Sequence, residues 1–385
     1  MEQKDQPMKI AAAVALSCIG VFGIFASPIL VSALGATLGM THEQTGSITA
    51  AEQLGTALAT LAAIGWVRTL NWRRIALLAI VVVVAVNLLS AWQTDAGSLT
   101  VLRFIAGFAG QGSAFAIAIA IINDSGNHDR NFAFAIAAQV AVGILTLLTL
   151  PPLAKLYGIG GVMWPLAGLA LLVLPLIRWV PLHPRKKPAA AQGASESASV
   201  VPALVALAII LVWCTGLGGV WAFIIKIGDA SAVLDATAAG RALAISTLAG
   251  VGGALAASWL ADRLGRLIPV TVGLVVQIIA LSLLRGDMSF VQFAATCAVF
   301  QIFWNFTGPY LMGTVAASDF TGRLSVAIPT AQLGGFAIGP VLAGRLMTEN
   351  GLSAANFVGI AGCAFALLIF IPTAIRLGRR DLETA

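Results

Sequence analysis

A single carboxylate lies deep inside a hydrophobic stretch, and it is the residue best suited to carry a proton. Glu52 occupies the apolar run 44–66, beside Gln53, whereas the other Asp and Glu residues fall in tails, loops or the ends of apolar runs. An ionised carboxylate in apolar surroundings is costly unless it is protonated, paired or hydrated. Burial favours its neutral form, and a basic neighbour favours its charged form. Glu52 could therefore exchange a proton near neutral pH, or form a static ion pair that joins two helices.

The second buried charge is Arg103, in the apolar run 98–122 and in the pattern Arg103-x-x-x-Gly107-x-x-Gly110. The two glycines would let one face of this helix approach a neighbouring helix closely. Because Arg103 is about one helical turn from the start of its run, its long side chain could also extend to the polar surface. The pattern alone leaves both interpretations open.

Amide and aromatic side chains suited to a small solute gather in the run 289–316. Gln301 and Asn305 are four residues apart and share a helix face, with Trp304 beside that face and Tyr310 further along. Amides and a Trp suit a polar-aromatic or carboxylated solute, although the same groups also form hydrogen bonds between membrane helices. Weaker candidates of the same chemical kinds are Gln111, Gln139, Trp213 and Trp221.

The composition places these residues in a membrane. The 385-residue chain is 59% hydrophobic and only 10% charged, too few charges to cover a soluble domain. Its apolar runs approach or exceed the roughly 20 residues that a helix needs to cross a bilayer core. Hydropathy predicts about twelve spans, near 10–38, 44–66, 73–92, 98–122, 131–154, 161–181, 201–227, 237–260, 268–285, 289–316, 322–347 and 354–376.

One longer connection separates two halves of the chain. Residues 183–200 are rich in Pro, Ala and Ser and carry three basic residues, which is typical of a flexible linker. We therefore expect a six-helix bundle over 1–182, a cytoplasmic linker over 183–200 and a second six-helix bundle over 201–385. Most of the 22 Lys and Arg then lie on the side of the N-terminus, which predicts that both termini are cytoplasmic. The expected location is a bacterial inner membrane.

With this orientation, three basic residues lie near the outer ends of spans: Lys226, Arg241 and Arg345. Each alone is typical of an interfacial anchor. Together with Arg103 they would make the outer opening basic, which favours an anionic substrate through electrostatic focusing.

The sequence lacks the residue patterns that other classes of protein need. The three His lie in predicted loops, far apart, and the four Cys lie within separate apolar runs, so no metal-ligand or catalytic spacing is present. The sequence contains no Gly-rich phosphate-binding motif of the kind that an ATP-driven pump would need. The formal net charge of +6 does not indicate nucleic-acid binding, because apolar spans separate the basic residues from one another. We expect no enzyme activity, metal or cofactor, and a monomer whose partners are lipid, protons and a small solute.

A charged hinge between apolar runs occurs once in each half. It reads Ser258-Trp-Leu-Ala-Asp-Arg-Leu-Gly-Arg266 in the second half and, in degraded form, Gly65-Trp-Val-Arg-Thr-Leu-Asn-Trp-Arg-Arg74 in the first, where Thr69 replaces the expected Asp. This motif resembles the signature loop of the major facilitator superfamily of secondary transporters. The resemblance implies an all-α membrane fold of two pseudo-symmetric six-helix bundles that works by alternating access.

The resemblance also implies roles for several residues. Acids at the ends of the fourth and tenth spans would pair with hinge arginines and tie the cytoplasmic faces together, which predicts Asp319 with Arg263 or Arg266, and Asp124 with Arg73. Asp262 belongs to the same latch. In this superfamily an arginine placed like Arg103 faces the central cavity and assists proton transfer or binds an anion.

The expected function is proton-coupled uptake of a small organic anion, a carboxylate or aromatic acid. A proton-driven efflux antiporter for amphiphilic compounds is the alternative, although the Gly339-Pro340 pattern lies in the eleventh span rather than the fifth, where antiporters often carry it. A channel also remains open, but duplicated halves with hinge latches favour alternating access.

Overall fold

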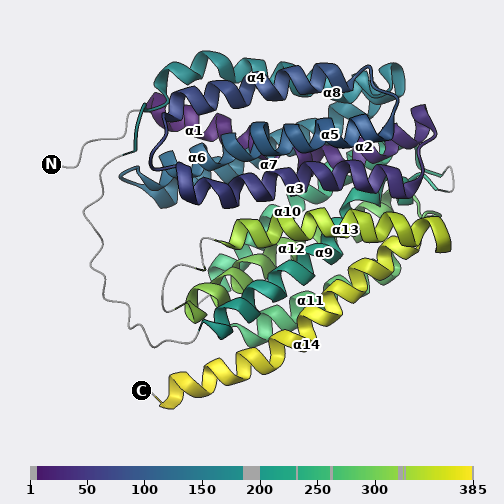
Figure 1. The fold of residues 1–385 in the computed structure, drawn as a ribbon. Helices are drawn as coiled ribbons and strands as arrows, with labels where there is room; N and C mark the ends of the chain where they lie inside the picture. The colour runs from purple at the N-terminus through teal and green to yellow at the C-terminus, as the bar shows by residue number, and fades with distance from the viewer. Residues whose placement is uncertain are drawn as a thin grey trace. The chain divides into compact units, whose positions relative to one another are not determined.

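The computed structural model describes residues 7–184, 200–230, 233–260, 263–319, 324 and 327–383, without the side chains of 128–129 and 376–383. The described residues are almost entirely helical, and no strand occurs among them (Figure 1). The chain divides into two compact units, residues 1–190 and 191–385. The boundary falls within the stretch that we predict to be a linker, of which 185–199 lie outside the described residues.

The N-terminal unit contains six spans, three of which are interrupted. The first span consists of α1 and α2, the fourth of α5, η1 and α6, and the sixth of α8 and η2. The element bounds are α1 Pro7–Gly20, α2 Phe22–Leu38, α3 His42–Trp66, α4 Trp72–Ser90, α5 Ala96–Ile105, η1 Ala106–Gly112, α6 Ser113–Asn123, α7 His128–Tyr157, α8 Gly160–Val173 and η2 Leu174–Trp179. Of the two η elements, η1 is a π-helix and η2 is a 3₁₀-helix.

The C-terminal unit contains six long helices. They are α9 Val201–Gly228, α10 Ala236–Leu260, α11 Leu267–Leu283, α12 Phe290–Ser318, α13 Ile328–Asn350 and α14 Ala354–Glu383. Helices thus occur in the described residues at all twelve predicted positions, with boundaries that differ by several residues. Among the helix starts, the largest shift is in the eleventh span, where α13 begins at Ile328 rather than near residue 322. Pro329 in the first turn accounts for this start, because proline lacks the N–H that a helix interior needs.

Short polar residues at the helix starts fix several spans. Thr41 and Gln44 form a capping box at α3, and Ser289 and Gln292 form another at α12. Asp95 accepts a hydrogen bond of 2.7 Å from the Ser98 N–H at the start of α5, and this bond lowers the pKa of the Asp95 carboxyl. These side chains satisfy the free N–H groups of the first turn and so end the loops at defined residues.

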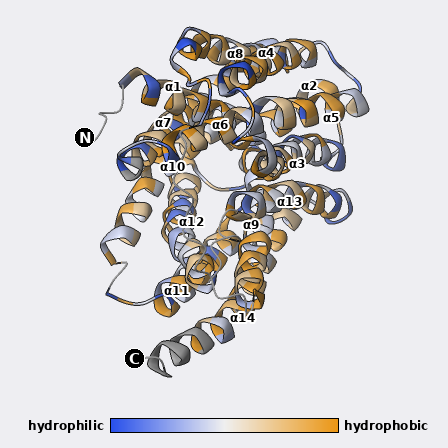
Figure 2. Cartoon of the chain, turned by 60° about the vertical axis from the view of Figure 1, so that its left-hand side comes forward, coloured by the Kyte–Doolittle hydropathy of each residue, from blue (hydrophilic) through white to orange (hydrophobic). Residues whose placement is uncertain are grey.

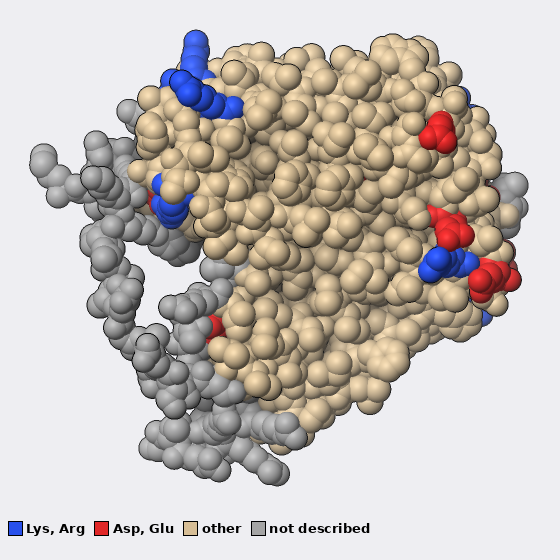
Figure 3. Space-filling model, viewed as in Figure 1, with Lys and Arg blue, Asp and Glu red and all other residues tan. Residues whose placement is uncertain are grey.

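The surface fits a lipid environment. Among the described residues, nine helical segments are long and apolar enough to cross a membrane, and α11 is a shorter apolar helix. Hydrophobic residues dominate the helices in Figure 2, and the face in Figure 3 shows few charged side chains around a wide uncharged surface. The helix α3 is more polar because it buries Thr45, Thr49, Glu52, Gln53 and Thr56 along one side.

Candidate functional site

Two glycines bring α3 against the π-helical part of the fourth span. A Cβ atom added at Gly107 would meet the backbone carbonyl of Glu52, and one added at Gly55 would meet the backbone of Phe104 and Phe108. Only glycine allows the two backbones to approach so closely. The predicted packing role of Gly107 is confirmed. A π-helical turn, as in η1, is frequent at functional sites.

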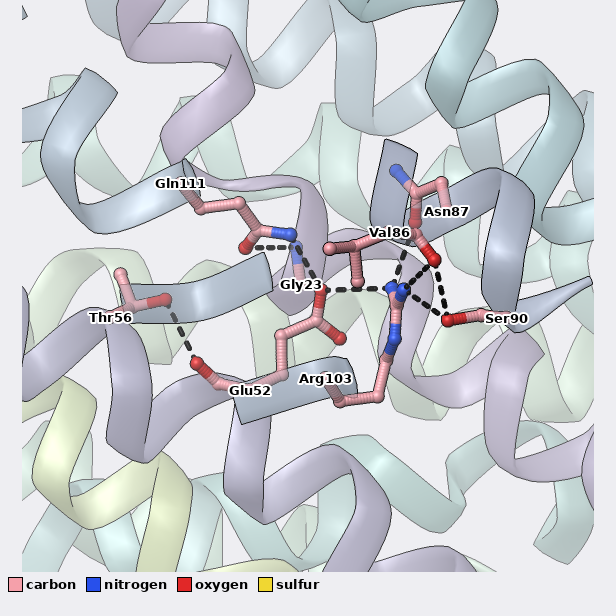
Figure 4. A network of polar contacts seen from close by, with 8 residues as sticks. All are labelled: Gly23, Glu52, Thr56, Val86, Asn87, Ser90, Arg103 and Gln111. Atoms are coloured by element: carbon pink, nitrogen blue, oxygen red, sulfur yellow. Dashed lines mark hydrogen bonds and ion pairs between the residues drawn. The ribbon is translucent and has the colours of Figure 1, made fainter. Parts of the chain in front are cut away.

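This close approach places Glu52 beside Gln111, on η1. The Gln111 amide group donates a hydrogen bond to Glu52 Oε1, and its carbonyl oxygen accepts one of 3.2 Å from the backbone N–H of Gly23 (Figure 4). Glu52 is only 4% exposed and Gln111 only 1%. Each end of the Gln111 side chain thus makes one hydrogen bond inside the N-terminal unit, and its contact with a substrate stays a prediction.

Arg103 supplies the positive charge that faces Glu52. Its Nη1 atom lies 3.6 Å from Glu52 Oε1, and both side chains are buried. The guanidinium also donates to Asn87 Oδ1 at 2.8 Å, to Ser90 Oγ at 2.7 Å and to the Val86 carbonyl at 3.3 Å, all on α4. At 1% exposure Arg103 does not extend to the polar surface. The structure thus brings the two predicted charges together in one cluster.

We call Glu52, Asn87, Ser90, Arg103 and Gln111 the N-terminal polar cluster (Figure 4). The sequence analysis did not select Asn87 or Ser90. Their spacing of three residues in an otherwise apolar helix puts both on one face, and that signal could have identified them. Among the described residues, the buried Arg103 Nε and Asn87 Nδ2 atoms have no hydrogen-bond partner. The guanidinium therefore has one donor that this part of the chain does not use.

The glycine contact gives a test of this geometry. We expect Gly107→Ala to separate α3 from η1, to destabilise the fold by about 1–3 kcal/mol, as overpacking does, and to slow transport. Gly168→Ala in α8 is the matched control, since a Cβ there meets no atom within 4 Å. Thermal unfolding and transport would be measured for both. Equal behaviour of the two variants would contradict the close contact.

The predicted latch of the first half has a different partner. Asp124 pairs with Arg68, whose Nη1 atom lies 2.8 Å from Asp124 Oδ1 and 2.9 Å from Oδ2. The predicted pair with Arg73 is wrong, because the Arg73 Nε–H donates instead to the Val180 carbonyl at 3.0 Å. Arg68 follows α3, whereas Arg73 lies in the first turn of α4 and faces η2. The contact joins the end of α3 to the end of α6.

Arg68→Ala tests this contact. The Asp124 side chain is 1% exposed and that of Arg68 is 44% exposed, so the variant leaves a buried carboxylate without its arginine. Hydrogen bonds to charged groups contribute about 1.5–3 kcal/mol, and partial exposure puts this pair at or below the lower end. We expect a lower unfolding temperature and a shift toward an inward-open state, measured by cysteine accessibility. Arg73→Ala is the control, and an equal effect there would contradict the assignment.

The second predicted latch has no ion pair among the described residues. Asp262 lies outside them, Arg263 lies over the Trp259 ring at 4.5 Å, and Asp319 Oδ2 accepts a hydrogen bond of 2.8 Å from the Leu324 N–H. No ion pair joins Asp319 to Arg263 or Arg266 within this described part. A latch in an outward-open state stays a prediction.

The C-terminal unit has its own polar centre at Gln277, on α11. Its Oε1 atom accepts from the Trp213 indole at 3.1 Å, and its amide donates to Thr307 Oγ1 at 3.1 Å and to the Gly273 and Phe303 carbonyls. Trp213 is fully buried and packs inside the C-terminal unit, and its contact with a substrate stays a prediction. Gln277 was not among the predicted site residues, although it is the one amide side chain in its predicted span, 268–285.

The other predicted substrate residues are placed as follows. Trp304 is half-buried and contacts the rings of Trp221, Phe300 and Phe336 at centroid distances of 5.6–5.8 Å. Asn305 donates to the Gln301 carbonyl at 2.9 Å, and the buried Tyr310 hydroxyl donates to the Ala257 carbonyl at 3.2 Å. Lys226 and Gln139 are half-buried and Arg241 is exposed.

A chain of twelve helical spans in two units, with a buried charge pair inside one unit, is a multi-pass membrane protein of the secondary transporter class. The family model described as Major Facilitator Superfamily matches residues 10–332, so the chain belongs to that superfamily of transporters. A search of curated proteins by sequence finds no match.

Solved structures of similar fold include two of the nucleoside transporter NupG. One of them has a TM-score of 0.71 at 12% identity, and the other, a point mutant, has a TM-score of 0.70 at 13% identity. Each match covers 97% of this chain and 99% of the other chain. A mutant of the peptide transporter POT in complex with sulfate has a TM-score of 0.74 at 12% identity, with 96% and 94% covered. At these identities the likeness concerns the fold.

Proposed function

We propose that this transporter takes up a small organic anion, a carboxylate or aromatic acid, together with a proton. The observation that carries the proposal is the Glu52–Arg103 pair, 3.6 Å apart and buried within one unit. In its ionised state the pair is neutral overall. A proton on Glu52 would leave the charge of Arg103 uncompensated, and an anion bound to the guanidinium would restore neutrality.

This charge balance explains coupling. Moving a net charge through an occluded, low-dielectric state is costly. The empty carrier with its ionised pair is neutral, and so is the carrier loaded with one proton and one monovalent anion. Carriers that hold only the proton or only the anion bear a net charge and should reorient slowly. The two favoured states give a stoichiometry of one proton to one anion.

Residues in the C-terminal unit would select the solute. Trp304 is half-buried at the edge of an aromatic cluster, and Asn305 lies beside it on α12. An aromatic acid could place its ring against Trp304 and its carboxylate near a basic group. Arg241, Arg345 and the half-buried Lys226 supply positive charge in this unit, which supports an anion by electrostatic focusing.

Efflux of amphiphilic compounds by proton antiport is the second candidate, and the same aromatic cluster favours it. The solved structures of similar fold are named as a nucleoside transporter and a peptide transporter. The fold therefore does not distinguish between substrate classes. For either function we propose a monomer in a bacterial inner membrane. Both termini would lie in the cytoplasm, since most Lys and Arg fall on that side.

A ligand screen separates the two candidates. Purified protein would be mixed with organic acids, sugars and cationic amphiphiles, and its unfolding temperature measured. A ligand that binds the folded state raises this temperature by mass action. Uptake predicts stabilisation by acids, more strongly at low pH, where Glu52 is protonated and Arg103 is available. Stabilisation by cationic amphiphiles alone would favour efflux and contradict the anion proposal.

A further inference from the structure

The break in the first span exposes one backbone donor that needs an acceptor. The helix α1 ends at Gly20 and α2 begins at Phe22, with Val21 in a non-helical conformation between them. Gly23 lies in the first turn of α2, where an N–H has no acceptor within its own helix. That N–H donates to Gln111 Oε1 at 3.2 Å, across to the fourth span. Backbone hydrogen bonds from Val21 to Cys18 and from Ile24 and Phe25 to Val21 also span the break, and Gln111 adds a side-chain bond from η1.

The orientation of the Gln111 amide follows from its two partners. A backbone N–H can only donate and an ionised carboxylate can only accept. The carbonyl end must therefore face Gly23 and the NH₂ end must face Glu52, as observed (Figure 4). Consecutive hydrogen bonds of one direction polarise and strengthen one another. The negative charge on Glu52 thus strengthens the bond that closes the helix break.

We propose that Gln111 is a positioning residue that couples the charge of Glu52 to the break between α1 and α2. With Glu52 ionised, the chain Gly23 N–H to Gln111 to Glu52 is fully polarised and the break is held firmly. With Glu52 protonated, the carboxyl is a weaker acceptor, the amide is less polarised and the break opens more often. The inference rests on the proposed role of Glu52 as the proton carrier.

Within the part of the chain that the structure describes, Arg103 on α5 is the charged group paired with Glu52 on α3. The atoms nearest to a Cβ placed at Gly23 belong to Gln53, Gln111 and Glu52. Gly23 itself leaves no room for a side chain, since a Cβ there would meet the Gln53 and Gln111 amides at 2.8–2.9 Å. Glycine at this position lets the amide reach the backbone.

Hydrogen–deuterium exchange of the peptide that contains Gly23 tests the coupling. All variants would be compared at one pH, in the same detergent or nanodiscs, so that the intrinsic exchange rate is constant. Gln111→Met removes the acceptor and should speed exchange at this segment about tenfold. Glu52→Gln removes only the charge and should speed exchange about threefold. Gln53→Met is the matched control and should leave exchange unchanged, because Gln53 makes no hydrogen bond to Gly23.

The combination of variants decides the mechanism. In the Gln111→Met background, Glu52→Gln should have no further effect, because the connection is already lost. Gln111→Glu keeps an acceptor for Gly23, so exchange should stay slow there, and Glu52→Gln should no longer accelerate it. If Gln111→Met does not fold, the Gln111→Glu background tests the coupling in its place. Additive effects, or equal exchange in wild type and Glu52→Gln, would overturn the coupling. Neither result depends on transport, so the proton-carrier role is judged separately from uptake.

Discussion

Glu52→Gln should lose uptake driven by a pH gradient while it still exchanges labelled for unlabelled substrate. The neutral amide mimics the protonated carboxyl, so the loaded carrier keeps its charge balance with the bound anion and reorients. Net uptake needs the empty carrier to release a proton and return, and the variant cannot do so. Exchange needs only the loaded form. The variant therefore separates the two activities.

The measurement is paired in the same proteoliposomes. In wild type, a gradient of one pH unit can concentrate the solute about tenfold if one proton accompanies each anion. In Glu52→Gln this accumulation should fall to none, with counterflow retained. Glu43→Gln is the matched control, because Glu43 lies on the same helix but is exposed in its first turn. Surviving accumulation would place the proton elsewhere, and loss of both activities would make Glu52 a structural or substrate-binding residue.

Much of this architecture can be predicted from the sequence because a bilayer strongly constrains the length and composition of the helices that cross it. Twelve apolar runs, one linker and a repeated hinge predict the spans and the superfamily. Glu52 and Arg103 stand out because charged residues within spans are rare and mostly functional. What the sequence cannot provide is the rotation of each helix about its axis. For this reason Arg68 rather than Arg73 reaches Asp124, and Trp213 turns inward to Gln277.

The N-terminal polar cluster was predicted only in part, and the reason is similar. Its charges lie on α3 and α5, but the residues that orient them lie on α4 and η1, and short polar side chains in a span have many possible uses. Asn87 and Ser90 become meaningful only when the α4 face that they share is seen to hold the Arg103 guanidinium. The π-helical turn that aims Gln111 has no clear sequence signal beyond the glycines around it.

Arg103→Ala should abolish uptake of an anionic substrate. The substitution removes the group that compensates Glu52 and, after protonation, would bind the anion. Truncating one partner of a buried charge pair costs about 2–5 kcal/mol, which corresponds to a loss of affinity of about 30-fold or more. The orphaned Glu52 should then remain protonated, so that gradient-driven accumulation fails as well.

Arg103→Lys should keep part of the activity, and the comparison identifies what the arginine supplies. A lysine retains the charge opposite Glu52 but lacks the planar fork that reaches Asn87, Ser90 and the anion together. We therefore expect a raised KM with proton dependence preserved. Arg241→Ala is the control, since Arg241 is basic but exposed and should affect only the approach of the substrate. Normal uptake by Arg103→Ala, measured with the same acid in the same proteoliposomes, would make the pair a structural contact and remove the main support for an anionic substrate.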